Sequence, residues 1–249
     1  MRGDIAYGRI PVFEFDITCG RLAGVLADDN IKRRDVESEV TEFLIVRHGE
    51  TLWNREHRIQ GQRNSELSPG GERQALATGQ RLKTAGCTRL VSSDLGRTLQ
   101  TSQPIAAATG LAIETDARLR ERAFGVFEGA TPEEIRARDP AAHARWQARE
   151  PDYAICGGES LAALMTRARV CLESIANDTS SRAARVIIVT HGGVLDVIYR
   201  IAAQLALDAP RTWPLLNSSI NRIVIEDGAW RVLDWGDVAH LPATEDDFG

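Results

Sequence analysis

Two histidines in this sequence each follow a short run of apolar, largely β-branched residues. The run Phe43–Val46 leads, one residue later, to His48, and the run Val186–Val189 leads, at the same spacing, to His191. Uninterrupted apolar runs of this length are typical of strands that are buried on both faces of a parallel sheet. Ligands of open α/β sheets bind beyond the carboxyl ends of the strands. We therefore expect His48 and His191 to lie at the ligand-binding edge of one sheet.

Glycines and arginines accompany these histidines. A glycine follows each of them, and Gly192, after His191, would let a backbone N–H approach a ligand closely at the start of the next helix, where an anion is favoured. Arg47 precedes His48, and Arg97 follows a third apolar segment near residue 90. A single histidine at a strand end is more often a structural residue, but two of them with two arginines favour a site for an anionic ligand.

The composition restricts the class of protein. Of 249 residues, 43% are hydrophobic and 26% are charged, as in ordinary globular proteins, and the formal net charge of −5 lacks the basic footprint of a nucleic-acid-binding protein. The four cysteines show neither disulfide-framework nor zinc-finger spacing. The sequence has no apolar run long enough to span a bilayer and no signal-peptide pattern. We expect a cytoplasmic protein that binds neither nucleic acid nor membrane, with homodimer formation left open.

Strand and helix patterns alternate along most of the chain. Helices are predicted from Ser68-Pro69 to about residue 85, over 95–109, over 132–150, from Ser160 to Ala176 and from Val194 to about Leu205, with Asp94 as a possible cap. Further strands are predicted at 89–93 and 111–114, and a hairpin at 220–225 and 230–233. This alternation predicts an α/β three-layer sandwich, in which a mostly parallel central sheet is flanked by helices on both faces.

The composition changes near residue 41. Residues 1–41 mix charges with short apolar stretches, and the alternating segment 10–17 could form one edge strand. We interpret residues 1–41 as an N-terminal extension of unknown role and residues 42–249 as the α/β domain.

Several sequence blocks resemble a known family. The segment Leu44–Thr51, followed by Trp53-Asn54, resembles the signature of the histidine phosphatase superfamily, which includes the cofactor-dependent phosphoglycerate mutases. The resemblance covers about residues 43–240 and continues, in the expected order, through Gln60-Gly61, Leu67-Ser68, Ser92–Thr98, Leu119–Arg122, Phe124-Gly125, Glu128-Gly129, Gly158–Ser160 and Thr190–Gly193.

The resemblance implies a role for each matching residue. His48 would be the nucleophile that becomes phosphorylated, Glu121 the general acid and His191 a donor to the transferring group. Phosphate would be bound by Arg47, Asn54, Gln60, Arg97 and Gly192. We expect no cofactor and no metal, because arginine can neutralise phosphate oxygens bidentately. We also expect Nδ1–H of His48 to donate to a nearby backbone carbonyl, which would leave Nε2 free to attack phosphorus.

The resemblance leaves the reaction open between hydrolysis and mutase chemistry. The second histidine block has Gly193 where mutases have asparagine, the Glu121 block lacks their histidine-tyrosine pair, and the region 127–157 is short. These departures favour a metal-independent phosphomonoester hydrolase, the phosphatase branch, acting on a small phosphorylated metabolite. Phosphoglycerate mutase is the alternative, with Arg63, Arg120 and Arg122 as candidates to bind a second acid group. An inactive binding module is a third alternative, which would lack at least one catalytic residue.

Overall fold

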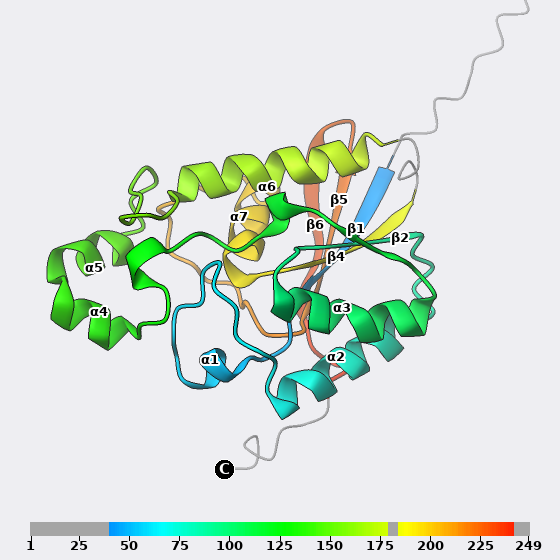
Figure 1. Cartoon of the computed structure of the whole chain (residues 1–249). Helices are drawn as coiled ribbons and strands as arrows, with labels where there is room; N and C mark the ends of the chain where they lie inside the picture. Colours follow the sequence, from blue (N-terminus) through cyan, green and yellow to red (C-terminus); the bar gives the residue numbers. More distant parts are fainter. Residues whose placement is uncertain (1–39, 179–183, 242–249) are drawn as a thin grey trace, which may run out of the picture. The chain divides into compact units, whose positions relative to one another are not determined.

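The computed structural model describes residues 40–178 and 184–241 (Figure 1). Four strands pair in parallel, in the spatial order β3 (Ile113–Thr115), β2 (Arg89–Ser92), β4 (Arg185–Thr190) and β1 (Val40–Arg47). Strand β5 (Ile220–Glu226) lies antiparallel beside β1, and β6 (Ala229–Asp237) pairs with β5 to complete the predicted hairpin. Among the strands of the described residues β5 alone runs against the others, so the sheet is mostly parallel, as predicted.

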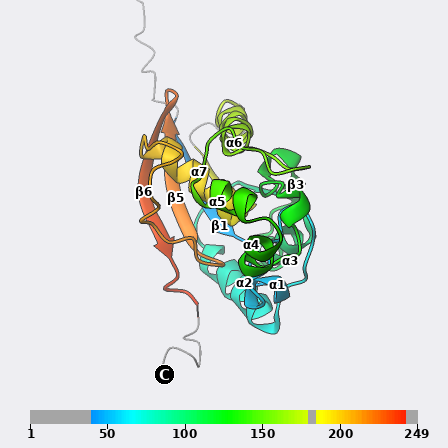
Figure 2. The same cartoon turned by 90° about the vertical axis from the view of Figure 1, so that its left-hand side faces the viewer.

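Helices cover both faces of this sheet (Figures 1 and 2). In β1, Phe43 and Ile45 pack in one apolar cluster with α6 (Leu161–Ala176) and α7 (Gly192–Ala202). The alternate residues Leu44 and Val46 belong to a second cluster, which includes residues of α2 (Pro69–Leu82) and α3 (Gly96–Thr109). Because successive side chains of a strand point to opposite faces, a strand with helices on both sides needs an unbroken apolar run. The three-layer prediction is confirmed.

The predicted helix over residues 132–150 is wrong in one respect: it is two helices. Helix α4 (Pro132–Arg138) ends at Arg138, and Asp139 separates it from α5 (Pro140–Gln147). Proline lacks the N–H that a continuous helix would use, and it is tolerated at the first helical position, so Pro140 starts a new helix. Asp139 caps α5 by accepting the backbone N–H of Ala142 at 2.9 Å. These helices pack on a small apolar cluster around Phe127.

The remaining elements are short and lie in the connections. Helix α1 (Leu52–Arg55) follows β1, and two 3₁₀ turns, η1 (Ala117–Leu119) and η2 (Gly125–Phe127), flank the segment of Glu121. The side chain of Ser68 caps α2 as predicted, but Asp94 does not cap α3, whose N-cap residue is Leu95. Asp94 binds Arg120 instead, through two hydrogen bonds of 2.7 and 2.6 Å.

The first residues of the chain lie largely outside the description. Val40 and Thr41, the last residues of the interpreted extension, form the start of β1, while the predicted edge strand at 10–17 lies outside the described residues. Within the part of the chain that the structure describes, none of the helices is long and apolar enough to cross a membrane.

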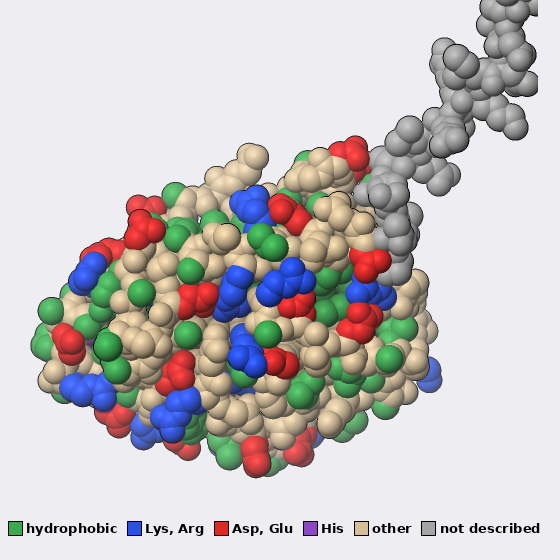
Figure 3. Space-filling model, turned by 45° about the horizontal axis from the view of Figure 1, so that its top comes forward, with side chains coloured by type: hydrophobic (Ala, Val, Ile, Leu, Met, Phe, Trp, Pro, Cys, Tyr) green, Lys and Arg blue, Asp and Glu red, His purple; other side chains and the backbone are tan. Residues whose placement is uncertain are grey.

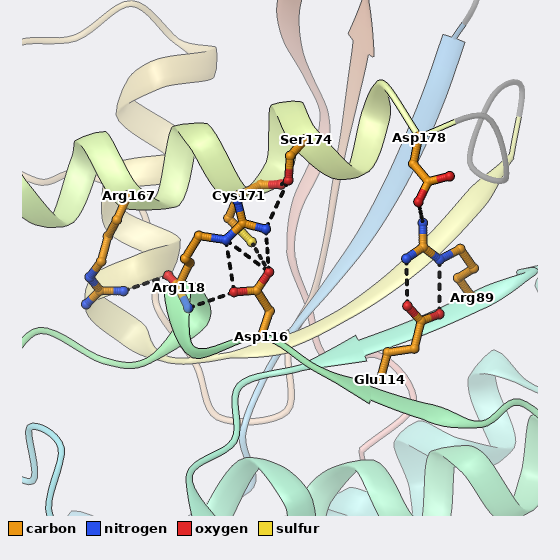
Figure 4. Close-up of polar contacts among 8 residues, drawn as sticks. All are labelled: Arg89, Glu114, Asp116, Arg118, Arg167, Cys171, Ser174 and Asp178. Atoms are coloured by element: carbon orange, nitrogen blue, oxygen red, sulfur yellow. Dashed lines mark hydrogen bonds and ion pairs between the residues drawn. The ribbon is translucent and has the colours of Figure 1, made fainter.

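Helix α6 is attached by polar contacts to the segment that leads from β3 toward Glu121 (Figure 4). Asp116 accepts from Arg118 at 2.6 Å and from the Cys171 thiol of α6 at 3.5 Å. Arg118 also donates to Ser174 at 3.0 Å, and Arg167 of α6 donates to the Arg118 carbonyl at 2.7 Å. Burial raises the pKa of the Cys171 thiol to about 12, so this cysteine is an unreactive packing residue.

Charged side chains of both signs are interspersed on the face shown in Figure 3. Arg89, for example, contacts two carboxylates at the edge of the sheet, Glu114 at 2.6 Å and Asp178 at 3.3 Å (Figure 4). Ion pairs that reach solvent contribute little to stability, because water and salt screen them. The stability of the fold therefore depends mainly on the two apolar layers.

This account predicts unequal effects of two apolar truncations. Ile188 lies in β4 with no exposed surface, and Ile188→Ala is expected to lower the free energy of unfolding by about 2–5 kcal/mol, because it leaves a cavity. Val170 on α6 is 49% exposed, and Val170→Ala is expected to change that free energy by less than about 0.5 kcal/mol. Urea denaturation of both variants measures the difference, and equal losses would contradict the assignment of stability to the sheet layers.

Candidate active site

The two predicted histidines meet at the carboxyl ends of β1 and β4. The parallel register sets Arg47 opposite Thr190, and His48 and His191 are the next residues of each strand. The backbone N–H of His48 donates to the Thr190 carbonyl at 2.9 Å, and the two imidazole centroids lie 5.3 Å apart. Both side chains are almost completely buried. The expectation that the two histidines share one edge of the sheet is confirmed.

The ring of His48 is held in one orientation and one tautomer. Its Nδ1 lies 2.8 Å from the carbonyl oxygen of Gly49, and a carbonyl can only accept, so Nδ1 carries the proton. Gly49 is itself fixed, because its N–H donates to Thr101 at 3.0 Å. The lone pair of His48 is therefore on Nε2, as the sequence analysis expected of a nucleophile.

His191 is oriented by a serine from the end of β2. Its Nε2 lies 2.8 Å from Oγ of Ser93, and that oxygen also accepts the backbone N–H of Leu95 at 3.4 Å. When the Ser93 hydroxyl donates to Nε2, Nδ1 of His191 carries the proton. This Nδ1 is buried and has no hydrogen-bond partner among the described residues.

The two predicted phosphate-binding arginines are anchored by backbone carbonyls. Arg97 is 1% exposed and donates to the carbonyls of Arg63 and Gly61 at 2.8 and 2.7 Å, while Arg47 donates to the carbonyl of Leu215. In both guanidinium groups Nε is buried and finds no partner in the described part of the chain. Buried N–H groups are nearly always paired in folded proteins, so these donors are suited to an anionic ligand.

Glu121 reaches the same edge from the segment between η1 and η2. Its two carboxylate oxygens accept the backbone N–H groups of Arg122 at 2.7 Å and of Gly193, in the first turn of α7, at 2.9 Å. A Cβ at position 193 would lie 2.3 Å from the Glu121 carboxylate, so a side chain there would displace it. The backbone carbonyl of Glu121 is held by Gln62 at 3.2 Å and by Arg167 at 2.9 Å.

The three remaining predicted residues also lie here, in different environments. Asn54 uses Oδ1 to accept from Thr51 at 3.1 Å, which leaves its Nδ2 as the end able to donate. Gln60 donates to Thr51 at 2.8 Å, and its other amide atom, a buried oxygen, can only accept, so in this conformation Gln60 supports Thr51. Gly192 is the first residue of α7, and a Cβ there would lie 3.5 Å from the Arg47 guanidinium.

The loop 203–219 between α7 and β5 also contributes to the site, although no sequence motif predicted it. The carbonyl of Leu215 orients Arg47, Asn217 donates to the His48 carbonyl at 2.9 Å, and the N–H of Ser218 donates to the Arg47 carbonyl at 3.0 Å. A usable signal was the hairpin: a strand antiparallel to β1 begins at the edge where β1 ends, so the residues before it must lie near His48.

The surroundings keep both histidines neutral. Burial lowers the pKa of His48 well below its ordinary value of 6.5, and the positive charges of Arg97 and Arg47 lower it further. Burial likewise lowers the pKa of His191 well below 6.5, and among the neighbouring charges that of Arg97 lowers this pKa most. Burial also lowers the pKa of Arg97, to about 10, which leaves it charged at neutral pH. The site therefore combines two fixed cations with an unprotonated imidazole nitrogen.

Two of the three arginines considered for a second acid group are bound within the protein. Arg120 is bound by Asp94, and Arg122 is buried and donates to the carbonyls of Glu159 and Tyr153 at 2.8 and 2.9 Å. Arg63 donates to the Glu128 carbonyl at 3.1 Å. Over the residues described, the structure shows no group of three histidine, cysteine or acidic side chains placed to hold a metal ion.

Comparisons with known proteins agree with this arrangement. The sequence pattern of the histidine phosphatase superfamily (branch 1) matches residues 43–238. The probable phosphoglycerate mutase GpmB of Citrobacter koseri is 40% identical over 212 residues, which cover 81% of this chain and 95% of that protein. The solved structure of YhfR from Bacillus stearothermophilus has a TM-score of 0.75 and 34% identity, covering 81% of this chain and all of that one.

A second solved structure is that of a mycobacterial glucosyl-3-phosphoglycerate phosphatase in complex with VO3. It has a TM-score of 0.69 and 28% identity, and the match covers 79% of this chain and 99% of that one. The named relatives thus include both a mutase and a phosphatase. The sequence match and the shared fold lead to one conclusion: this chain belongs to branch 1 of the histidine phosphatase superfamily.

Proposed function

We propose that the protein is a metal-independent phosphomonoester hydrolase that forms a phosphohistidine on His48. One observation carries the proposal: Nε2 of His48 is unprotonated and lies at an edge where three buried nitrogens, Nε of Arg47, Nε of Arg97 and Nδ1 of His191, have no partner in the described residues. These donors are suited to the equatorial oxygens of a phosphoryl group, whose transfer depends mainly on charge neutralisation and in-line geometry.

The reaction proceeds in two steps. In the first, the lone pair of His48 Nε2 attacks phosphorus, the P–O ester bond breaks, and the leaving oxygen takes a proton from the carboxyl group of Glu121. In the second, the Glu121 carboxylate removes a proton from water, the resulting hydroxide oxygen attacks phosphorus, and the P–N bond breaks to release phosphate and restore neutral His48. Glu121 serves as acid and then as base. Arg47 and Arg97 stay charged throughout.

Two features favour hydrolysis over mutase chemistry. A mutase must hold a bisphosphorylated intermediate through cations that bind its second acid group, and two of the three arginines considered for that role, Arg120 and Arg122, are bound within the protein. Gly193 stands where mutases have asparagine, and a Cβ at this position would lie 2.3 Å from the Glu121 carboxylate. The placement of Glu121 at the N-terminus of α7 therefore depends on a residue that differs from the mutase pattern. A phosphatase with 28% identity, crystallised with VO3, also supports this branch, while the GpmB relatives keep the mutase as the alternative. As the partner of the site we propose a small phosphate ester.

The nucleophile is tested with p-nitrophenyl phosphate in excess EDTA. Wild-type activity is expected to persist, and His48→Ala is expected to lower kcat/KM on the order of a thousandfold or more, because the attacking atom is removed. His57→Asn is the matched control, since His57 is exposed and has a φ of 55°, which asparagine tolerates. Equal rates in wild type and His48→Ala would rule out His48 as nucleophile. Conversion of 3-phosphoglycerate with catalytic 2,3-bisphosphoglycerate, without hydrolysis, would establish the mutase.

The role of Glu121 is tested by the choice of leaving group. Nitrophenolate leaves without a proton, whereas the alkoxide of glycerol 3-phosphate requires one. Glu121→Gln is therefore expected to lower the rate of the first step with glycerol 3-phosphate by about 10²–10⁴-fold, and to lower it much less with p-nitrophenyl phosphate. Rapid-quench measurement of phosphoenzyme formation isolates this step. A loss of equal size with both substrates would contradict general-acid catalysis by Glu121.

The neutrality of His48 is tested by NMR of the ¹⁵N-labelled protein. Because its pKa lies well below 6.5, His48 is expected to remain the neutral Nδ1–H tautomer as the pH falls through 6.5, where an unperturbed histidine is half protonated. Arg97→Met removes the positive charge that contributes most to the lowered pKa and is therefore expected to raise this pKa. By linkage, the unfolded chain binds protons that the folded histidines do not, so these residues reduce stability as the pH falls below 6.5. Titration of wild-type His48 near 6.5 would contradict this electrostatic account.

A further inference from the structure

A cavity of about 450 Å³ lies beside the proposed phosphate site. Arg47, Glu121, Gly192 and Gly193 line it, whereas His48 is not among its described lining residues. In an in-line transfer the nucleophile and the leaving group are on opposite sides of phosphorus, and the general acid faces the leaving oxygen. This inference rests on the proposed function: with Glu121 as the general acid, the cavity that Glu121 lines holds the leaving group.

The walls of the cavity suggest the size of that group. Much of the lining is apolar and comes from distant segments: Phe124, Trp146, Leu161, Leu164 and Leu215. Cavities of roughly 300–1,000 Å³ are typical of sites for ligands much larger than glycerol. A three-carbon alcohol would leave most of these apolar walls without contact, so the cavity is suited to a body the size of a ring.

Three further arginines line the cavity, and two are bound within the protein. Arg149 is paired with Asp196 and donates to the Leu207 carbonyl at 3.1 Å. Arg122 donates to two backbone carbonyls, as described above. Arg211 is exposed, and the structure records no ion pair for it within the described ranges. Arg211 is thus the uncompensated positive charge of the outer wall.

The backbone that carries Arg211 is anchored on both sides. Arg200 of α7 donates to the carbonyl of Ala209 at 2.9 Å, two residues before it. Trp213, two residues after it, is buried and stacks on Tyr199 with ring centroids 4.3 Å apart. The Arg211 charge also contributes, after burial, to the lowered pKa of Arg47. The side chain therefore extends from a fixed base into the electrostatic surroundings of the phosphate site.

We propose that Arg211 binds a second anionic group, such as a carboxylate, on the leaving group. The substrates favoured by this site are then phosphate monoesters of ring-sized alcohols that carry an acid group away from the phosphate. Arg211 is a specificity residue in this assignment, since it touches the part of the substrate that does not react. The same cavity would accept the uncharged counterpart of such a substrate more weakly.

The test uses binding, so it does not depend on turnover. 4-Carboxybenzylphosphonate has a P–C bond that cannot be hydrolysed, and in its carboxylate methyl ester a methyl group replaces the second charge. Isothermal titration calorimetry is expected to show roughly tenfold tighter binding of the acid than of the ester by the wild type, because a charged hydrogen bond is lost in the ester. Arg211→Gln is expected to abolish this preference. Arg231→Gln is the matched control, because Arg231 is exposed on β6 and does not line the cavity.

Several results would overturn the proposal. These are equal affinities of the wild type for acid and ester, a preference that persists in Arg211→Gln, or no binding of either compound. The size of the leaving group is tested with 3-phosphonopropionate, which is expected to bind at least tenfold more weakly than the ring acid; equal binding would refute the ring-sized assignment. If His48→Ala keeps full phosphatase activity while the acid preference depends on Arg211, the proposed mechanism fails and the subsite stands.

Discussion

Strands β1 and β4 pair in parallel, in a register that sets Arg47 opposite Thr190, and the site depends on this pairing. Both strands are buried on both faces, so a slip of one residue would turn every side chain of β1 to the opposite helix layer. It would also separate His48 from His191. The hydrogen bond from the His48 N–H to the Thr190 carbonyl extends the pairing one residue beyond the strand, which gives the nucleophile the rigidity of the sheet.

The same edge concentrates positive charge in a buried place. A buried cation is unfavourable unless dipoles or opposite charges compensate it. Backbone carbonyls compensate part of the charge of Arg97 and Arg47, and Glu121 stabilises both electrostatically. Burial lowers the pKa of His48 and of His191, and the remaining positive potential lowers both further, so both stay unprotonated. The buried positive charge at this edge opposes folding, and a bound dianionic ligand would neutralise it. Functional sites commonly show such local conflicts with stability.

The parts of this arrangement that follow local rules could be predicted from the sequence. Unbroken apolar runs identified β1 and β4, and the Ser68-Pro69 pair identified the start of α2, because burial and capping depend on neighbouring residues. The roles of Leu215 and Asn217 could not be predicted, since they act through contacts with residues about 170 positions away and carry no periodic pattern. The break at Asp139 was missed although Pro140 marked it, because the alanine and arginine content left the packing face of residues 132–150 weakly marked.

The phosphate site and the adjoining cavity share Arg47, Glu121 and the start of α7, but the outer part of the cavity draws on other segments. The ends of β1, β2 and β4 supply the groups around His48. Helix α5, helix α6 and the loop 203–219 add residues such as Trp146, Leu161 and Arg211 to the cavity wall. Loops tolerate substitution better than the central strands that they connect. Substitution is therefore tolerated best at exposed wall positions such as Arg211, whereas Leu215 and Asn217 of the same loop hold Arg47 and His48. Variation at the exposed wall would change which esters fit the cavity, while the groups that transfer phosphate stay the same.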